Sequence, residues 1–443
     1  MSNPFRIVIV GAGPAGLSAA IAIAQHPSSS APSRSVHITV LELRPGVQTI
    51  GGAVNMTPLA LHYLDALGGA GARLRPRGHA ASAIELVAHR TGRLLATLWP
   101  GVDALRVRRQ DVVEALTEAA VALGDSNEDP DALRIVYGAR VEDLAELDNG
   151  GVRVTYTRED DKARAAAETI EADLVLGCDG IHSIVRRRLV EPDRPETYTG
   201  KCVAYGFLPA TAADAARWTR AGGQPLVRHT TLVQHGAESL LLARHQPAGD
   251  DETTSSESSL YVAVVMPVPP DEAGDRREGR AVRDKDELRR AIADRFAGGA
   301  IDCLGEVLAR CDDWFFYPVR MLPDGGAWSE GHVLLLGDAA HAMPPQGEST
   351  GVAIEDGVLV AHVLSRRGDG RDVSRMIADY EALRRADVAA LHRTSMARWN
   401  GGGGGGGWLG RVVMEWMAWV VVSYLNWTSD HFARDVRNLP LPE

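Results

Sequence analysis

Residues 5–17 read FRIVIVGAGPAGL, and this stretch decides the fold. The apolar run before the glycines is typical of a strand buried in a parallel sheet. Gly11, Gly13 and Gly16 follow it with the spacing GxGxxG, and a helix is expected from Pro14 onward. The first glycine permits a tight turn, the second lets the backbone approach a pyrophosphate, and the third allows close helix–strand packing. The stretch therefore predicts the first half of a dinucleotide-binding βαβ unit.

A second strand, VHITVLEL at 36–43, completes this unit and places Glu42 near its end. A carboxylate at that point can accept hydrogen bonds from a ribose diol. GxGxxG alone is a weak signal, but a strand, a helix and a terminal acid in register make it strong. The candidate residues for a dinucleotide in this unit are Gly11, Gly13, Ala15, Gly16, Glu42 and Arg44.

Two further stretches repeat the pattern far along the chain. They are ADLVLGCDGIHSIVR at 172–186 and HVLLLGDAAHAMPPQGE at 332–348. Each has an apolar run that suits a buried strand, a turn of small residues, and a plausible helix start. Three such turns in one chain indicate a single large dinucleotide shared between distant segments.

Composition narrows the class of protein. The chain has 443 residues with a net charge of −11, and no cluster of Lys and Arg stands out. Nucleic acid is therefore not an expected partner, because phosphate contacts need clustered positive charge. The cysteines, Cys178, Cys202, Cys303 and Cys311, form no CxxC pair, so no metal site is expected. With no signal peptide before the first strand, a reduced cytoplasmic setting fits best.

The tail carries WLGRVVMEWMAWVVVSYLNW at 408–427 after a glycine run at 401–407. Glycine is a poor helix former, so the run predicts a flexible tether. Arg411 and Glu415 interrupt the apolar stretch, which favours a helix packed on the protein over a membrane span. A helix lying in the membrane interface, with its tryptophans near the headgroups, is the main alternative.

Taken together, the three motifs resemble those of the class A flavoprotein monooxygenases, the para-hydroxybenzoate and salicylate hydroxylase family. The resemblance covers about residues 1–395 and implies that the dinucleotide is FAD. It implies that Asp179 and Gly180 serve both FAD and NAD(P)H, that Asp338 binds the ribitol, and that Arg109 contacts FAD. Gly51, Gly52 and Asn55 match the segment under the flavin. The further candidate cofactor-binding residues are Gly52, Arg109, Asp179, Gly180, Asp338, Ala339, Pro345, Gly347 and Gly351.

The resemblance implies an α/β fold in which a Rossmann-type FAD-binding domain is interleaved with a mostly antiparallel substrate domain and followed by C-terminal helices. The expected domains are FAD-binding (1–70, 100–200, 326–395), substrate (71–99, 201–325) and tail (396–443).

Simpler structural roles are alternatives for several of these residues. An Asp is a good N-cap, so both motif aspartates can cap helices instead of binding a ligand. The remaining alternatives are ordinary surface charges at Arg109, beside Arg106 and Arg108, and at Glu355 and Asp356.

Two departures from the family pattern stand out. The loop after the third motif runs PPQGESTG at 344–351, where the family commonly has PPxGGQGxN. In addition, Gly206 follows Tyr205, where salicylate-type relatives often carry an arginine. The sequence therefore predicts that a cation facing the flavin is missing from this strand.

The resemblance also implies a reaction. NAD(P)H reduces FAD, O2 adds to form a flavin C4a-hydroperoxide, and one oxygen passes to an aromatic or lipophilic substrate of the secondary-metabolite type by hydroxylation or epoxidation. An FAD-dependent dehydrogenase or oxidative cyclase without oxygen insertion is the alternative. The candidate catalytic residues are Tyr205, Arg228 and His229, all in the middle third of the chain.

Overall fold

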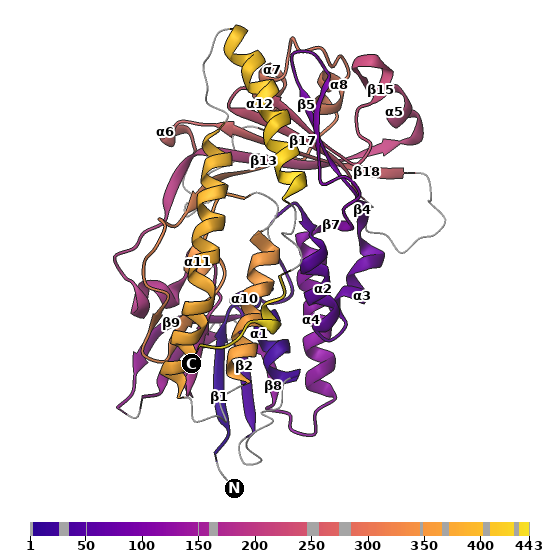
Figure 1. The fold of residues 1–443 in the computed structure, drawn as a ribbon. Helices are drawn as coiled ribbons and strands as arrows, with labels where there is room; N and C mark the ends of the chain where they lie inside the picture. The colour runs from indigo at the N-terminus through magenta and orange to yellow at the C-terminus, as the bar shows by residue number, and fades with distance from the viewer. Residues whose placement is uncertain are drawn as a thin grey trace.

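The computed structural model describes residues 3–25, 35–49, 51–148, 150–158, 167–245, 257–273, 285–345, 349–365, 372–401, 408–428 and 434–442. Two large sheets dominate it: one lies across the top of Figure 1, and the other lies below it, around β1 and β2.

The lower sheet has six strands, parallel except for β20 at one edge. Their order is β20 (Ser329–Glu330), β21 (Val333–Leu335), β12 (Leu174–Gly177), β1 (Phe5–Val10), β2 (Val36–Leu41), β8 (Leu133–Val136). Because parallel strands end at the same edge, the register brings Val10, Gly177 and Leu335 side by side. The three motif turns, which are far apart in the sequence, therefore meet at one edge of this sheet.

Helices cover this sheet and bury most of its apolar surface. Glycine sets the closest crossing: at Gly357 an added Cβ would lie 2.5 Å from the backbone nitrogen of Ala19. Only a residue without a side chain allows two helices to approach so closely. The covering helices are α1 (Pro14–Gln25), α2 (Pro58–Ala66), α3 (Ala70–Leu74), α4 (Arg109–Asp125), α10 (Ser349–Leu364) and α11 (Val373–Asn400).

The upper sheet has seven strands, antiparallel except where β16 pairs with β5. A second apolar core lies between it and α7 (Lys285–Arg295) and α8 (Leu304–Ala309). An antiparallel hairpin within residues 84–98 forms its edge. The strand order is β19 (Phe315–Met321), β13 (Thr197–Thr211), β18 (Glu257–Pro267), β17 (Glu238–His245), β16 (Thr230–His235), β5 (Ile84–Ala88), β6 (Leu94–Leu98).

Two smaller three-stranded sheets complete the fold. One lies between the large sheets and consists of β3 (Ala53–Met56), β7 (Ala104–Arg108) and β4 (His79–Ala81). The other, at the lower left of Figure 1, consists of β9 (Ala139–Glu146), β10 (Val152–Arg158) and β11 (Glu168–Ala172).

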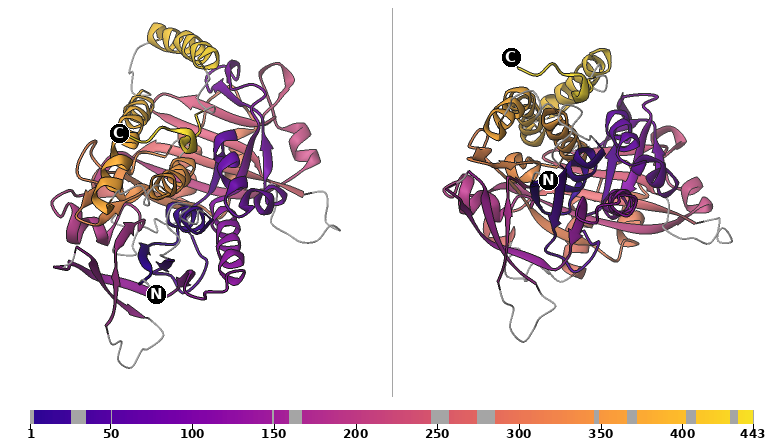
Figure 2. Two further views of the ribbon diagram at one scale, coloured as in Figure 1. Left: turned by 60° about the horizontal axis from the view of Figure 1, so that its bottom comes forward. Right: turned by 90° about the horizontal axis from the view of Figure 1, so that it is seen from below.

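Helix α12 (Trp408–Trp427) lies against β6 at the free edge of the upper sheet (Figure 2). The side chain of Asn426 satisfies that edge: its Oδ1 accepts the backbone N–H of Trp99 (2.8 Å), and its Nδ2 donates to the carbonyl of Thr97 (2.8 Å). The chain then returns to the lower unit, where Val436 donates its N–H to the hydroxyl of Tyr63 (3.0 Å). The tether expected at 401–407 lies outside the described residues apart from Gly401. Within the described ranges, no helix has both the length and the apolar character needed to cross a bilayer.

Candidate active site

The first motif forms a turn that only glycine can make. Gly11 has φ 105°, and an added Cβ there would lie 2.5 Å from the carbonyl oxygen of Cys178. Gly13 has open space on its Cα side, which suits the close approach of a ligand. The carboxylate of Glu42 accepts the N–H groups of Ala12 (2.8 Å) and Arg44 (2.9 Å), so the end of the second strand is tied to the glycine turn.

The second motif combines capping with an open acceptor. Oδ2 of Asp179 accepts the N–H of Ile184 at 2.6 Å, at the start of the helix, but the cap itself is Ser183, whose Oγ accepts the N–H of Arg186 at 2.9 Å. Its Oδ1, however, is buried without a hydrogen-bond partner among the described residues. Burial raises the pKa of this carboxyl, and the hydrogen bonds from Ser183 and the backbone oppose that shift. Gly180 follows with φ 76°. An acceptor left open in this way fits a ligand that donates a hydrogen bond.

The third motif stands on a buried ionic network. Oδ2 of Asp356 accepts the N–H of Gly337 (2.8 Å) and pairs with Nε2 of His341 (2.8 Å). Its Oδ1 accepts Nε of Arg384 (2.7 Å), whose Nη1 reaches Glu355 (2.8 Å). Asp356 is fully buried, so the alternative of a surface charge is wrong for this residue. Its burial opposes ionisation, but Arg384 and His341 outweigh that effect and hold its pKa at about 2.

Two buried arginines hold the third motif in place, and one of them, Arg186, also belongs to the second motif. Nη1 of Arg186 donates to the carbonyl of Ala339 (2.9 Å), and its Nη2 donates to that of Ile181 (2.6 Å). Arg194 donates to the carbonyls of Ala340 and Pro323. The sequence analysis missed Arg194 as a positioning residue. The carboxylate of Asp338 is half-buried and accepts no hydrogen bond from the residues that the structure describes.

Arg109 lies beneath the glycine pair that precedes β3. Its side chain passes Gly51 so closely that an added Cβ there would lie 2.9 Å from its Cδ, and its N–H donates to the carbonyl of Gly52 (3.1 Å). Its Nε is buried and has no partner in the described part of the chain. The alternative of a surface charge is therefore wrong for Arg109, because the side chain is packed under this turn. Pro345 is exposed and Gly351 lies in the first turn of α10, whereas the candidate Gly347 lies outside the described residues.

An aromatic wall on the upper sheet faces the same glycine pair. Tyr205 on β13 stacks on Phe315 with a centroid distance of 5.2 Å and lies 6.2 Å from the ring of Tyr261. A Cβ at Gly52 would lie 2.6 Å from the hydroxyl of Tyr261 and 2.9 Å from the ring of Tyr205. Phe207 extends the wall beyond Tyr261, at 5.1 Å. The sequence analysis missed Tyr261, although it alternates with core residues on a predicted strand.

Gly206 points to the other side of β13. A Cβ there would lie 2.4 Å from Sγ of Cys311, in the second core, because successive strand residues face opposite sides. A side chain at 206 would therefore face away from the aromatic wall. The cation on the wall side is Arg106 of β7, which interacts electrostatically with Tyr261. The alternative of a surface charge is wrong for Arg106 too, since it is only 2% exposed.

The other two candidate catalytic residues lie just before β16. Arg228 is exposed to solvent. His229 is half-buried, and its Nδ1 lies 2.9 Å from the hydroxyl of Ser82. Neither stands in the aromatic wall, so their catalytic roles stay predictions.

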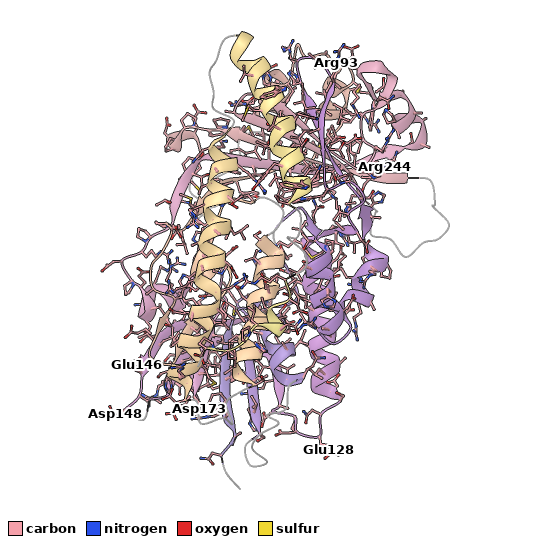
Figure 3. The ribbon with its side chains drawn as sticks, in the orientation of Figure 1. Arg93, Glu128, Glu146, Asp148, Asp173 and Arg244 are labelled. Atoms are coloured by element: carbon pink, nitrogen blue, oxygen red, sulfur yellow. The ribbon has the colours of Figure 1, made fainter. Side chains whose placement is uncertain are left out.

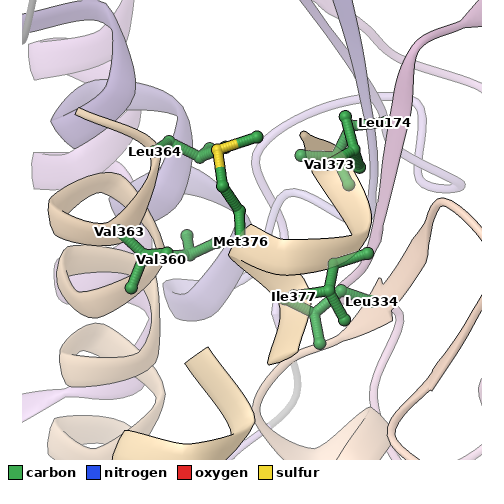
Figure 4. Close-up of a pocket in the computed structure, with 8 residues that line it drawn as sticks. All are labelled: Leu174, Leu334, Val360, Val363, Leu364, Val373, Met376 and Ile377. Atoms are coloured by element: carbon green, nitrogen blue, oxygen red, sulfur yellow. The ribbon is translucent and has the colours of Figure 1, made fainter. Parts of the chain in front are cut away.

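A pocket elsewhere has the wrong chemistry for a polar ligand. It lies between the lower sheet and the helices α10 and α11 (Figure 4), and all its lining side chains are aliphatic or thioether groups. It reads as a packing gap lined by Leu174, Leu334, Val360, Val363, Leu364, Val373, Met376 and Ile377. No cluster of metal-ligating side chains occurs within the described ranges.

The described residues fit FAD. A glycine cradle at Gly13, the unpaired Oδ1 of Asp179 and the carboxylate of Asp338 belong to the motifs that meet at one sheet edge. The unpaired Nε of Arg109 lies at the start of α4, beside the Gly51–Gly52 turn. These are the acceptors, the donor and the open backbone that a long, hydroxyl-rich dinucleotide needs.

Curated relatives are hydroxylases that match most of the chain. The 6-hydroxynicotinate 3-monooxygenase of Pseudomonas fluorescens is 27% identical over 89% of this chain and 91% of its own. The salicylate hydroxylase of Pseudomonas putida is 25% identical over 90% and 85%. The 3-amino-4-hydroxybenzoate 2-monooxygenase of Streptomyces cremeus is 28% identical over 89% and 86%.

Solved structures share the fold. Klebsiella pneumoniae HpxO, complexed with FAD and uric acid, superimposes with a TM-score of 0.71 at 20% identity, covering 96% of each chain. A salicylate hydroxylase substrate complex gives 0.72 at 19% identity, covering 98% of this chain and 96% of that one. Residues 5–395 match the family described as FAD binding domain. The chain therefore belongs to this family, and it is a class A FAD-dependent monooxygenase.

Proposed function

We propose that this FAD-dependent monooxygenase uses NAD(P)H and O2 to hydroxylate an electron-rich aromatic ring. The aromatic wall of Tyr205, Tyr261 and Phe207 carries the proposal, because it faces the Gly51–Gly52 turn beside Arg109. Flat side chains at this place suit a flat substrate held against the cofactor. The relatives named for hydroxynicotinate, salicylate and aminohydroxybenzoate chemistry support the same substrate class.

When bound, FAD takes a hydride from the nicotinamide and passes electrons on to O2. The protein has to orient the substrate and exclude water. Tyr205, Tyr261 and Phe315 are suited to both tasks, because they pack as one apolar surface. Burial and the neighbouring tyrosines raise the pKa of Tyr261, with Arg106 opposing the shift, so its phenol is neutral at physiological pH and can donate a hydrogen bond.

We assign the two expected roles to the two sheets. The unit around the six-stranded sheet would hold FAD, because all three motif turns meet at its edge. The seven-stranded sheet would form the substrate side through its aromatic wall.

The test is the visible spectrum of the purified protein, followed without oxygen after NADPH is added. A panel of phenols and aromatic acids, with matched non-phenolic controls, is added in parallel. We expect a yellow protein whose flavin bleaches faster with one panel member, and hydroxylated product once O2 is admitted. Flavin reduction without product, and without hydrogen peroxide from uncoupling, would instead assign a dehydrogenase or oxidative cyclase.

We also propose that α12 contacts a membrane surface. Trp416, Tyr424 and Trp427 are each more than half exposed, and their spacing places them on one face of the helix. Tryptophan and tyrosine suit the headgroup region, where a ring is apolar at one end and polar at the other. The short apolar length fits contact with the interface rather than insertion.

Vesicle flotation tests this contact. We expect the protein to float with phosphatidylcholine vesicles, and the double variant Trp416→Ser/Trp427→Ser to stay in solution. Val121→Ser on α4 is the control, because Val121 is also an exposed apolar residue on a helix. Deleting the whole tail is a poorer test, since Val436 packs in the core of the lower unit. If the protein does not float, or if the variant loses self-association instead, the exposed aromatic face of α12 does not bind a membrane.

A further inference from the structure

Arg106 carries a buried charge that no described residue neutralises. Its side chain is 2% exposed, and no carboxylate in the described part of the chain lies within ion-pair distance of it. Burial lowers its pKa to about 10, and only the electrostatic effect of Tyr261 opposes that shift. An unpaired buried cation is costly, so proteins retain one where a ligand supplies the missing charge.

Neutral partners hold this guanidinium in one orientation. Its Nη2 donates to Oδ1 of Asn55 (2.7 Å) on the neighbouring strand and to Oγ1 of Thr230 (2.9 Å) at the start of β16. Asn55 and Thr230 are anchored on different sheets, so the group is fixed from two sides. Nε and Nη1 donate to none of the described residues. Arg106 therefore presents a pre-oriented fork with free N–H groups, the geometry that suits an oxyanion.

The surroundings add positive potential. Burial, reinforced by nearby arginines, lowers the pKa of His79 and that of His245, the latter to about 4. His245 is buried, and neither of its ring nitrogens has a partner among the described residues. Arg244 lies at the end of β17, far from the labelled carboxylates at the opposite end of the molecule (Figure 3).

Asp111, whose charge opposes the lowering of the pKa of His245, is already paired with an arginine. Asp111 pairs with Arg108 through Oδ1 (2.6 Å) and Oδ2 (3.0 Å). Asp111 is therefore not free to pair with Arg106, and within the described ranges the potential at the free N–H groups of Arg106 stays positive.

The position of Arg106 relates it to the aromatic wall. It lies opposite Asn55 in the register of β3 and β7, and β3 begins directly after the Gly51–Gly52 turn. Tyr261 packs beside this turn and also interacts electrostatically with Arg106. A small aromatic molecule stacked along the wall can therefore reach the guanidinium with a substituent while its ring stays beside Gly52.

We propose that Arg106, oriented by Asn55 and Thr230, binds a carboxylate or a comparably small oxyanion on the aromatic substrate. This deepens the proposed function and rests on it, because the substrate is taken to occupy the aromatic wall. Arg106 thus acts as a specificity-determining residue that selects acids over their neutral analogues.

Calorimetric titration of the FAD-loaded protein tests this selectivity without turnover. The probes are benzoate, salicylate and nicotinate, each compared with its uncharged amide. We expect at least one acid to bind about tenfold to a hundredfold more tightly than its amide, as a charge-assisted hydrogen-bonded pair predicts. In Arg106→Met the acid should lose this advantage, and in Arg106→Lys it should keep part of it.

The control is Arg93→Met, which removes an exposed arginine from the turn between β5 and β6, at the top of the molecule in Figure 3. It should leave the preference for acids unchanged. Equal binding of acid and amide by the original protein, a preference that survives in Arg106→Met, or no binding of any probe would each overturn the proposal. The proposed function fails by a different observation, namely flavin reduction that no aromatic compound accelerates.

Discussion

Two buried arginines on opposite sides of the active site show how differently one protein can treat the same charge. Arg384, 3% exposed, stands between Asp356 and Glu355 and fixes the third motif. Arg106, 2% exposed, has among the described residues the neutral oxygens of Asn55 and Thr230 as its partners. The first charge is neutralised by the fold itself, which is what a permanent cofactor frame requires. The second charge is left for a substrate, which binds and leaves in every catalytic cycle.

Arg109 is intermediate between these two. Its backbone is tied to Gly52, yet its buried Nε has no partner in the described ranges. We interpret it as an arginine that the bound cofactor completes. The three residues therefore predict three kinds of mutational effect, on stability, on cofactor affinity and on substrate selection.

The largest effect is expected at Arg384. Arg384→Met leaves Asp356 and Glu355 without their cation, and breaking a buried ion pair costs about 3–5 kcal/mol of unfolding free energy. Urea unfolding of the FAD-loaded protein measures this loss. The control is Arg385→Met on the same helix, whose more exposed pair with Glu381 should be worth less than about 1 kcal/mol. Equal losses of unfolding free energy in the two variants would contradict the claim that the buried pairs of Arg384 stabilise the fold.

Low pH should destabilise the folded protein near Arg106, because His245 becomes protonated there. Its folded pKa of about 4 lies below the usual value of about 6.5, so the unfolded chain binds the proton first. The stability from neutral His245 is complete above pH 6.5 and falls as pH drops towards 4, by roughly 2 kcal/mol between pH 7.5 and pH 5. Urea midpoints at the two pH values measure it. His245→Phe should reduce the decrease, and an identical decrease in both proteins would sink the assignment.

At Arg109 the effect should appear in cofactor affinity. The buried Nε of Arg109 has no partner among the described residues, and we interpret it as a donor to FAD. Arg109→Gln should therefore lower FAD affinity by about 1–2 kcal/mol, or roughly ten- to thirtyfold. The apoprotein should unfold at nearly the same urea concentration as before. Fluorescence titration of apoprotein with FAD gives the affinity. If the apoprotein is destabilised as much as FAD binding is weakened, Arg109 belongs with Arg384 as a structural residue.

The smallest change in stability is expected at Arg106 itself. Replacing an uncompensated buried cation with an apolar side chain of similar length is often neutral or stabilising. Arg106→Met should therefore shift the unfolding free energy by less than about 1 kcal/mol, or raise it. Thermal unfolding without any aromatic ligand measures this. A loss comparable to that of Arg384→Met would show that the fold does depend on this charge.

The sequence predicted the cofactor frame because its signals are local. Gly11, Gly180 and Gly337 each need a positive φ at a strand end, and such turns leave a readable pattern in the sequence. The register of parallel strands then brings the motifs together, so three local patterns predict one site. Helices α10 and α11 supply the C-terminal helices that the resemblance implies.

The substrate side could not be predicted in the same way. Arg106 sits in the string RVRR, which resembles a surface charge cluster in sequence. Its burial depends on Thr230 and Tyr261, which are more than a hundred residues away and belong to another sheet. The same holds for Gly206, whose meaning lies in its contact with Cys311. Pairings of this kind arise from tertiary packing and leave no period in the chain.

The return of the chain to Tyr63 has a consequence for how the protein is made. The hydroxyl of Tyr63 receives the N–H of Val436, a residue 373 positions later, and β1 must wait for β12 and β21 before its sheet is complete. During synthesis the amino-terminal half therefore emerges with open strand edges and an unsealed core. Such contacts form only after the intervening chain has been made, so chaperone protection of the nascent chain should matter more for its yield than for that of a protein with local contacts.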